Sequence, residues 1–309
     1  MGILLLDRNR DLNPWVMALQ QQLPNANIEV YPKVRDIAAI DFVITMRPDP
    51  ISFQQFPNVK VVHCIGAGVN YILEANVVTE AMILARIVDP YLTEDMWEFV
   101  LSVVLTQIKN LPTFVEEQRV RNWKPMSYRR FKETNIAVLG LGKIGAYTAA
   151  EFAKLGFQVT GWSNSKKNIL GVESYVSLEQ LPKCLEKADF LVNILPLTAS
   201  TKHILNKVNL QYLPQGAFLI NVGRGQHNQE ADIIELLDRG HLSGALLDVF
   251  SQEPLPATHP FWKHPKVFVT PHIASVTNAN SAVTQIADNY KRFKKGIALE
   301  NVVSLEKGY

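Results

Sequence analysis

The sequence predicts an α/β protein made of two doubly wound parallel-sheet domains, with the second domain inserted into the first. Short β-branched runs alternate with helical stretches twice along the chain, a pattern typical of parallel sheets. A glycine-rich turn follows the first strand of the second series. The chain then closes with an amphipathic helical pattern that can return to the first domain.

The first domain is expected over residues 1–98 plus 280–309. Its strands are predicted in the runs ILLLD, NIEVYP, DFVITMR, VKVVHCIG and ILARI. The closing helix has apolar residues at helical spacing: Val283, Ile286, Ala287, Tyr290 and Phe293. This spacing gives one apolar face that can be buried.

A helix over residues 93–111 is expected to connect the domains. Thr93 can cap its beginning, and Pro112 follows its end. The basic and aromatic segment that follows, residues 112–134, lacks a clean period. A nucleic-acid contact there is weighed but not favoured, because one short patch on a nearly neutral protein is a weak electrostatic signal.

The second domain is expected over residues 99–279. Six strands are predicted, in the runs NIAVLG, FQVTGW, DFLVNILP, AFLINVG, GALLDVF and VFVTPH. Six strands with helices between them are about what a doubly wound sheet requires.

Composition and charge exclude several classes of function. The chain has 309 residues, 31 basic and 29 acidic side chains and a net charge of +2, which gives no sign of a nucleic-acid or membrane partner. Neither a signal peptide nor a membrane span is predicted, so a cytoplasmic location is expected. Cys64 and Cys184 are far apart and have no zinc-site spacing, so we predict packing roles and no metal.

A GxGxxG turn follows the strand at NIAVL. Gly140 permits the tight turn, Gly142 allows a pyrophosphate to approach the backbone, and Gly145 lets helix and strand pack closely. The helix after it and the strand at FQVTGW complete a βαβ unit. The second domain is therefore predicted to be a Rossmann coenzyme domain; the alternative is a tight turn without a ligand.

The second strand of this unit ends without the acid that usually binds the ribose of NAD. Ser163, Asn164, Ser165, Lys166 and Lys167 stand there instead. A serine hydroxyl can donate to a 2′-phosphate and a lysine can offset its charge, so the loop favours NADPH, with NADH possible. The alternative is a polar turn with two solvated lysines.

Three side chains follow three later strands: Arg224, Glu253 and His272. Each alone is more often structural. Together they suit the reduction of a carbonyl, because His272 can donate a proton to oxygen, Glu253 can orient the ring and favour its protonated form, and Arg224 can bind a carboxylate. All three are expected at the carboxyl edge of the sheet, where ligands bind.

With these three residues and the glycine turn, the chain resembles the D-isomer-specific 2-hydroxyacid dehydrogenases. Within that family it resembles the glyoxylate/hydroxypyruvate reductase A branch. The resemblance runs from end to end through the motifs CIGAGVN, MWEFVL, RNWKP, GLGKIG, GWSNS, ILPLT, NVGRG, LDVFSQEPLP, HPKVFVTPHIA and the closing KGY. It implies a flavodoxin-like substrate domain around a Rossmann domain, an active site in the cleft between them, a small 2-oxoacid substrate and a homodimer. The basic segment before Phe131 then becomes a dimer arm.

The resemblance also implies roles for individual residues. It assigns His272 as the proton donor, Glu253 as its partner and Arg224 as the substrate arginine. The residues implied to bind the rest of the substrate are Gly66, Ala67, Gly68 and Arg47. The further residues implied around the coenzyme are Lys143, Ile144, Leu195, Pro196, Val222 and Asp248.

One residue departs from the pattern of the branch, because Asn164 stands where members that prefer NADP(H) carry arginine. The alternatives are another dehydrogenase of the superfamily, such as one for formate or phosphite, and a coenzyme-binding corepressor. Glu253 argues against a formate enzyme, which pairs the histidine with glutamine.

Overall fold

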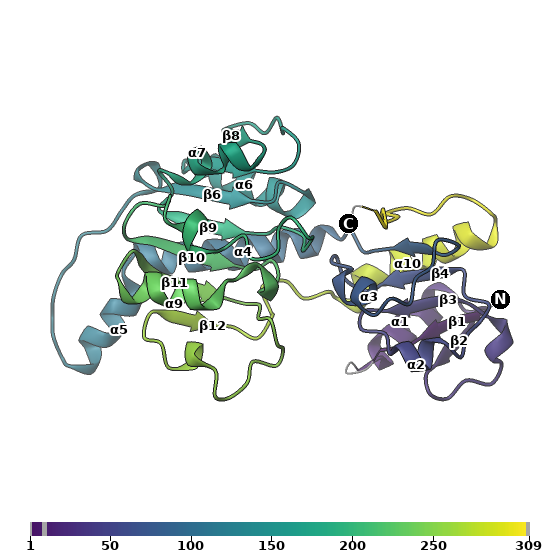
Figure 1. Ribbon diagram of the computed structural model, residues 1–309. Coiled ribbons are helices and arrows are strands. Elements are labelled where there is room, and N and C mark those ends of the chain that lie inside the picture. The colour runs from purple at the N-terminus through teal and green to yellow at the C-terminus, as the bar shows by residue number, and fades with distance from the viewer. Residues whose placement is uncertain (1, 8–10, 307–309) are drawn as a thin grey trace. The chain divides into compact units, whose positions relative to one another are not determined.

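The computed structural model describes residues 2–7 and 11–306 of the chain. Contacts divide the protein into two units, formed by residues 1–92 with 276–309 and by residues 93–275 (Figure 1). We refer to them as the smaller unit and the larger unit. The expected boundaries after residues 98 and 279 stay a prediction, and the closing KGY lies outside the described residues.

The smaller unit is a parallel α/β sheet with helices on both faces. Its five strands have the order β2-β1-β3-β4-β5, the flavodoxin-like order. The strands are β1 (Gly2–Leu5), β2 (Asn27–Val30), β3 (Ile40–Thr45), β4 (Val61–Cys64) and β5 (Ile83–Ala85). The helices are α1 (Asn13–Gln22), α2 (Pro50–Phe53), α3 (Asn70–Glu74), α10 (Ala279–Lys294) and the 3₁₀ turn Ile37–Ala39.

Residues of β1 alternate between two hydrophobic layers. Ile3 and Leu5 pack with α1 and α10, whereas Leu4 lies in the opposite layer. Helix α10 buries Val283 and Ile286 in the first of these layers, so the apolar face predicted for the closing helix is confirmed. All five predicted strands are present.

The larger unit is a seven-stranded parallel sheet in the order β12-β11-β10-β9-β6-β7-β8. The strands are β6 (Asn135–Leu139), β7 (Gln158–Trp162), β8 (Val172–Tyr175), β9 (Phe190–Asn193), β10 (Ala217–Asn221), β11 (Leu242–Leu247) and β12 (Val267–Val269). The helices are α4 (Pro90–Ile108), which begins in the smaller unit, α5 (Leu111–Arg119), α6 (Lys143–Lys154), α7 (Leu181–Leu185), α8 (Lys207–Leu210) and α9 (Glu230–Asp238). Four 3₁₀ turns complete it: Phe131–Glu133, Leu178–Gln180, Gly225–His227 and Pro260–Trp262.

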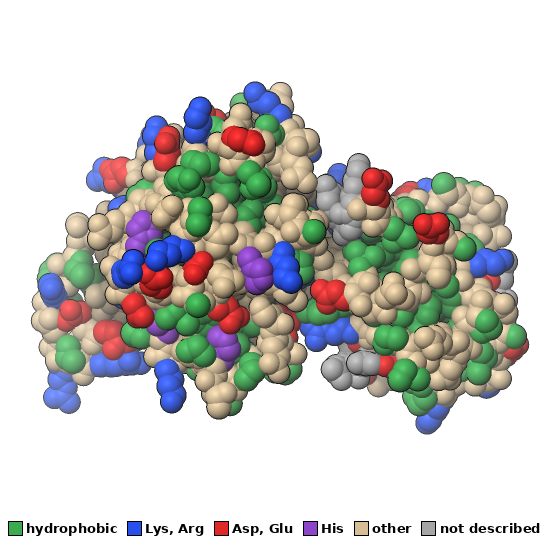
Figure 2. All heavy atoms as spheres, in the orientation of Figure 1, with side chains coloured by type: hydrophobic (Ala, Val, Ile, Leu, Met, Phe, Trp, Pro, Cys, Tyr) green, Lys and Arg blue, Asp and Glu red, His purple; other side chains and the backbone are tan. Residues whose placement is uncertain are grey.

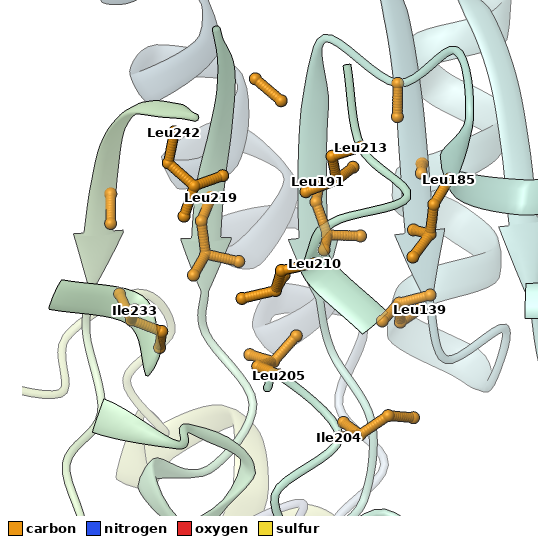
Figure 3. Packing of buried hydrophobic residues seen from close by; sticks show 14 of the residues in the cluster. Leu139, Leu185, Leu191, Ile204, Leu205, Leu210, Leu213, Leu219, Ile233 and Leu242 are labelled. Carbon is orange, nitrogen blue, oxygen red and sulfur yellow. The ribbon is translucent and has the colours of Figure 1, made fainter. Parts of the chain in front are cut away.

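Alternation along the central strands again produces two layers. In β10, Leu219 packs into the layer that contains α7, α8 and α9, and Figure 3 shows it beside Leu191 and Leu242. Phe218 and Ile220 point into the opposite layer, with α4 and α6. Helices therefore cover both faces, and the doubly wound fold predicted for this domain is confirmed.

The order of the strands reverses between β6 and β9, which are neighbours although β7 and β8 lie between them in sequence. Such a switch point separates the loops that follow the two strands and leaves room for a ligand. The glycine turn follows β6 and Leu195 follows β9, so both border this point.

Two expectations about the connecting helix are wrong. Helix α4 begins at Pro90 rather than Thr93, because a proline suits the first turn and the Asp89 carboxylate accepts the N–H of Tyr91 at 3.0 Å. It ends at Ile108, since Asn110 has a left-handed φ of 56°. Residues 111–119 then form α5 within the segment that showed no clean period.

The sequence also missed β8. This strand has only four residues, VESY, pairs with β7 alone and lies at the edge of the sheet. An edge strand of this length buries too little to need an apolar pattern.

Charged side chains of both signs are mixed on the visible surface of each unit (Figure 2). No described helix is both long and apolar enough to cross a bilayer.

Candidate active site

The glycine turn after β6 fits a bound dinucleotide. A Cβ on Gly145 would lie 1.7 Å from the carbonyl oxygen of Gly140, so only glycine allows this helix to approach the strand. Gly140 has a φ of +102° and lies against the backbone of Ile194. By contrast, nothing lies within 4 Å of a Cβ built on Gly142, and this residue gives α6 no side-chain cap. The space and the N–H groups at the start of α6 suit a pyrophosphate, with Lys143 exposed beside them.

The loop after β7 is organised by Ser163. This side chain is buried and its hydroxyl donates to the carbonyl of Ser165 at 2.8 Å. Because a hydroxyl has one proton and Ser163 donates it to Ser165, this side chain stabilises the loop and cannot also donate to a phosphate in this conformation. The side chains of Asn164, Ser165 and Lys166 are exposed and can contact a phosphate.

Leu195 and Pro196 follow β9, Val222 follows β10, and Ile144 lies in the first turn of α6. Leu195 and Val222 are buried, while Ile144 and Pro196 are half-buried. The N–H of Val222 donates to the Asn193 carbonyl at 3.2 Å, which connects the two loops.

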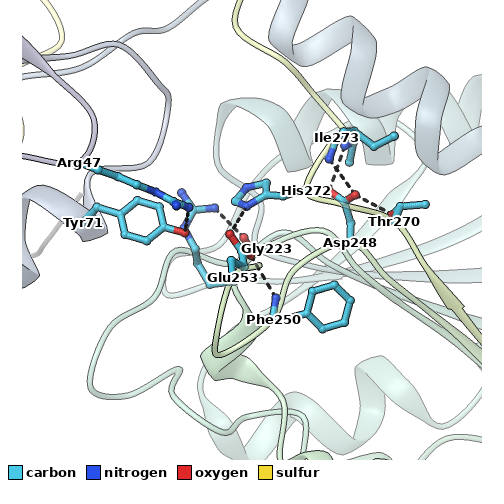
Figure 4. Close-up of polar contacts among 11 residues, drawn as sticks. Arg47, Tyr71, Gly223, Asp248, Phe250, Glu253, Thr270, His272 and Ile273 are labelled. Atoms are coloured by element: carbon cyan, nitrogen blue, oxygen red, sulfur yellow. Dashed lines mark hydrogen bonds and ion pairs between the residues drawn. The ribbon is translucent and has the colours of Figure 1, made fainter. Parts of the chain in front are cut away.

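Glu253 and His272 are brought together. The His272 Nδ1 lies 2.9 Å from Glu253 Oε2, and Glu253 Oε1 accepts the N–H of Phe250 at 3.2 Å (Figure 4). Both oxygens of the Glu253 carboxylate are therefore hydrogen-bonded, and this carboxylate orients the His272 ring. His272 is partly exposed and has a left-handed φ of 56°, a conformation that is uncommon outside glycine, although asparagine, aspartate and histidine adopt it more often than other residues.

Arg224 follows the neighbouring strand, β10. Its Nη1 donates to the carbonyl of Gly223 at 2.6 Å. Since β10, β11 and β12 are adjacent and parallel, Arg224, Glu253 and His272 all follow carboxyl ends at one edge of the sheet, as predicted.

Asp248 supports the histidine loop, a role that the sequence did not suggest. Its carboxylate accepts three hydrogen bonds, from Thr270 Oγ1 at 2.6 Å and from the N–H groups of Ile273 and Ala274 at 2.9 Å each (Figure 4). Its carbonyl accepts the N–H of His272. An aspartate at the end of an apolar strand is the available signal, because a buried carboxylate needs donors.

A second buried polar group, formed by Asn193, Asn221, His227 and Asn228, was also missed. Asn193 is the last residue of β9 and Asn221 the last residue of β10, while His227 and Asn228 lie in the loop after β10. All four side chains are almost wholly buried. The signal is similar, since Asn193 and Asn221 interrupt runs of apolar residues at neighbouring strand ends.

In the smaller unit, the turn Gly66–Gly68 follows β4. Cys64 is more than a packing residue, because its sulfur accepts the N–H of Gly66 and donates to the carbonyl of Gly68, both at 3.4 Å. Arg86 Nη1 donates to the Ala67 carbonyl at 3.1 Å. Within the described part of the chain, the N–H groups of Ala67 and Gly68 have no hydrogen-bond acceptor. The turn therefore offers two N–H groups, and that of Gly66 is already used.

Arg47 follows β3 and is half-buried. Its Nη2 donates to the Tyr71 hydroxyl at 2.7 Å, and the guanidinium lies 4.1 Å from the centre of that ring (Figure 4). Asp7 Oδ2 accepts the N–H groups of Met46 and Arg47. This arginine is held in a defined place rather than dispersed in solvent.

Over residues 2–7 and 11–306, no cluster of three His, Cys, Asp or Glu side chains could hold a metal ion.

A doubly wound sheet with a dinucleotide turn at its switch point and a carboxylate-held histidine at the same edge places the chain among the nicotinamide-dependent oxidoreductases. Residues 101–274 match the family described as D-isomer specific 2-hydroxyacid dehydrogenase, NAD binding domain. The protein belongs to this family, as the sequence predicted.

Relatives and solved structures agree with this assignment. The glyoxylate/hydroxypyruvate reductase A of Salmonella paratyphi B is 37% identical over 300 residues, 96% of each chain. A D-isomer specific 2-hydroxyacid dehydrogenase from Xanthobacter autotrophicus, solved with NADPH, superposes with a TM-score of 0.95 at 35% identity, over 100% of this chain and 99% of that one. An NADPH-dependent glyoxylate/hydroxypyruvate reductase from Sinorhizobium meliloti, solved with NADP and sulfate, gives 0.94 at 33% identity, with both chains fully covered.

Proposed function

We propose that the protein reduces small 2-oxoacids, such as glyoxylate and hydroxypyruvate, to 2-hydroxyacids with NADPH as the preferred coenzyme. The observation that carries this proposal is the 2.9 Å contact between His272 and Glu253 in a chain of this family. The names of the relatives supply the substrate class.

His272 would be the proton donor. Because the Glu253 carboxylate can only accept, the Nδ1–H of the imidazolium donates a hydrogen bond to it, and Nε2–H is left to face a substrate oxygen. Bound NADPH supplies the hydride that the carbonyl carbon needs. Donation of the proton by a placed histidine contributes roughly 10²- to 10⁴-fold in rate.

Arg224 would bind the oxoacid and polarise its carbonyl, since a guanidinium suits a carboxylate. In the smaller unit, the free N–H groups of Ala67 and Gly68 would donate to the substrate carboxylate. We propose substrate binding for this unit, with Arg47 as a further contact, and coenzyme binding for the larger unit.

The coenzyme preference is proposed from the loop after β7. It presents no carboxylate that would repel a 2′-phosphate, and Lys166 is exposed there. Two of the solved relatives contain NADPH or NADP. The pyrophosphate would be held by Gly142 and the start of α6, and the nicotinamide would lie beside Leu195, Pro196 and Val222.

Initial rates with glyoxylate and hydroxypyruvate, each with NADPH and with NADH, test the proposal. We expect turnover with at least one oxoacid and a higher kcat/KM with NADPH. Turnover with NADH alone would remove the coenzyme preference, and no turnover with any of the four pairs would refute the reductase.

A cytoplasmic homodimer is also proposed. Both cysteines are free, which suits a reducing compartment. Helix α5 and the segment after it expose large apolar side chains, among them Val120 and Trp123, the latter 95% exposed. Light scattering should give twice the 34.8 kDa chain mass, and a monomer would rule out the dimer.

A further inference from the structure

His227 is fully buried although it is polar, and the proposed reaction does not use it. It ends the 3₁₀ turn Gly225–His227, three residues after Arg224. A buried imidazole needs a partner at each ring nitrogen, and these partners lie on different loops. We name residues 194–200 the β9 loop and residues 222–228 the β10 loop.

The Nδ1 atom of His227 fixes the β10 loop to the end of β9. It lies 3.2 Å from the backbone nitrogen of Arg224, in the β10 loop, and 2.8 Å from Nδ2 of Asn193, the last residue of β9. The second hydrogen of that amide goes to Asn221 Oδ1, also at 2.8 Å. Since both neighbours of Nδ1 can only donate, this nitrogen must accept and carries no proton.

The ring proton therefore lies on Nε2, which faces the β9 loop. Nε2 is 3.3 Å from the carbonyl oxygen of Pro196, a group that also accepts the Thr201 hydroxyl at 2.7 Å. One ring thus spans the loop proposed to border the nicotinamide and the loop that carries the proposed substrate arginine.

Close packing leaves this bridge little freedom. A Cβ on Gly223 would lie 2.9 Å from Asn193 Nδ2 and 3.1 Å from His227 Nδ1. A Cβ on Gly225 would lie 1.8 Å from the backbone of Phe250, in the loop after β11. A displacement of the ring would therefore displace both loops.

The ring also stays neutral. Burial, with a smaller effect from the nearby Arg224 cation, lowers the pKa of His227 to about 4. A protonated ring would present a second donor to the N–H groups at Nδ1, so neutrality preserves both contacts.

We propose that His227 is a positioning residue that sets the β9 loop and the β10 loop relative to each other, with one ring nitrogen assigned to each loop. This role rests on the proposed function, because it gives the two loops their ligands. It predicts that the two ends of the ring can be disabled separately.

Two conservative variants disable one end each. His227→Asn places an amide oxygen near the position of Nδ1 and cannot reach Pro196, whereas His227→Gln carries an amide nitrogen as far as Nε2 and leaves Nδ1 empty. We expect the asparagine variant to raise the Kd for NADPH at least threefold with the oxoacid KM within twofold of wild type. The glutamine variant should raise the oxoacid KM at least fivefold with the Kd for NADPH within twofold.

His227→Phe removes both ends and should worsen both constants. His241→Phe is the matched control, because His241 Nε2 bonds the Leu210 carbonyl at 3.1 Å in the same unit but touches neither loop. This control should lower the melting temperature and leave both constants within twofold.

The readouts are NADPH binding by fluorescence titration and, without turnover, binding of oxalate to the NADPH complex. If the wild type reduces no 2-oxoacid, the proposed function fails while these titrations still decide the role of His227. The proposal is overturned if the asparagine and glutamine variants change both affinities alike, or if a folded His227→Phe protein keeps both within twofold.

Discussion

At the scale of single residues, His272 combines a proposed catalytic role with an unusual backbone conformation. Because its φ is 56°, alanine at this position would strain the backbone. A lower kcat in the alanine variant could then come from removal of the imidazole or from distortion of the loop. Asparagine tolerates this region, so His272→Asn is the cleaner test. We expect kcat to fall by about 10²-fold or more, the contribution of general acid catalysis, with the Kd for NADPH within twofold. A near-normal kcat would remove His272 as the proton donor.

Glu253→Gln tests the partner of the histidine. The glutamine oxygen can still accept the N–H of Phe250, but the side chain loses the charge that strengthens the hydrogen bond to His272 Nδ1. We expect kcat to fall by about tenfold, as for the loss of roughly 1.4 kcal/mol. The readout is kcat at a fixed pH, with the Kd for NADPH within twofold of wild type as the control for an intact coenzyme site. An unchanged kcat would leave Glu253 with a structural role only.

At the scale of elements, the loop after β7 is proposed to determine the coenzyme preference. Ser163→Asp would replace the hydroxyl that bonds Ser165 and bring a carboxylate close to a 2′-phosphate. We expect the ratio of kcat/KM for NADPH to that for NADH to fall at least tenfold. Lys166→Gln should lower the same ratio about threefold, as suits one exposed ionic contact worth less than 1 kcal/mol. If neither variant changes the ratio, the phosphate is recognised elsewhere.

The strands and the site residues differ in how well the sequence predicts them. Five strands of the smaller unit and six of the larger were predictable, because each contains a short run of mainly apolar and β-branched residues. β8 was not, since an edge strand with a glutamate and a serine lacks that pattern. The contact of Glu253 with His272 followed from the edge that they share, whereas the roles of Asp248 and His227 depend on which donors folding brings to a buried oxygen or nitrogen.

At the scale of the whole molecule, two buried histidines make stability depend on pH. Burial lowers the pKa of His63, in the smaller unit, and of His227, in the larger unit, from 6.5 to about 4. The unfolded chain therefore binds more protons than the folded protein between about pH 6.5 and 4. Above this window the two histidines do not lower the free energy of unfolding. As the pH falls through the window, the free energy of unfolding decreases by at most about 1.4 kcal/mol per pH unit for each histidine.

Denaturation by urea at pH 7 and at pH 5 measures this loss in each unit. His63→Asn should flatten the pH dependence of the smaller unit, and His227→Asn that of the larger one. Equal pH dependence in variant and wild type would mean that other groups control the acid sensitivity.

The hydrogen bonds of Asp248 to the histidine loop have a consequence for how the protein can diverge. Because this carboxylate fixes three donors of residues 270–274, of which two are backbone N–H groups, a substitution of Asp248 or Thr270 disturbs the proposed proton donor before it alters substrate range. The Arg47–Tyr71 pair belongs to the other unit and shares none of these bonds. Because Arg47 is a proposed substrate contact and Tyr71 holds it, descendants of this chain that acquire new substrates should carry their changes at residues 47 and 71, while the sequence around His272 stays constant.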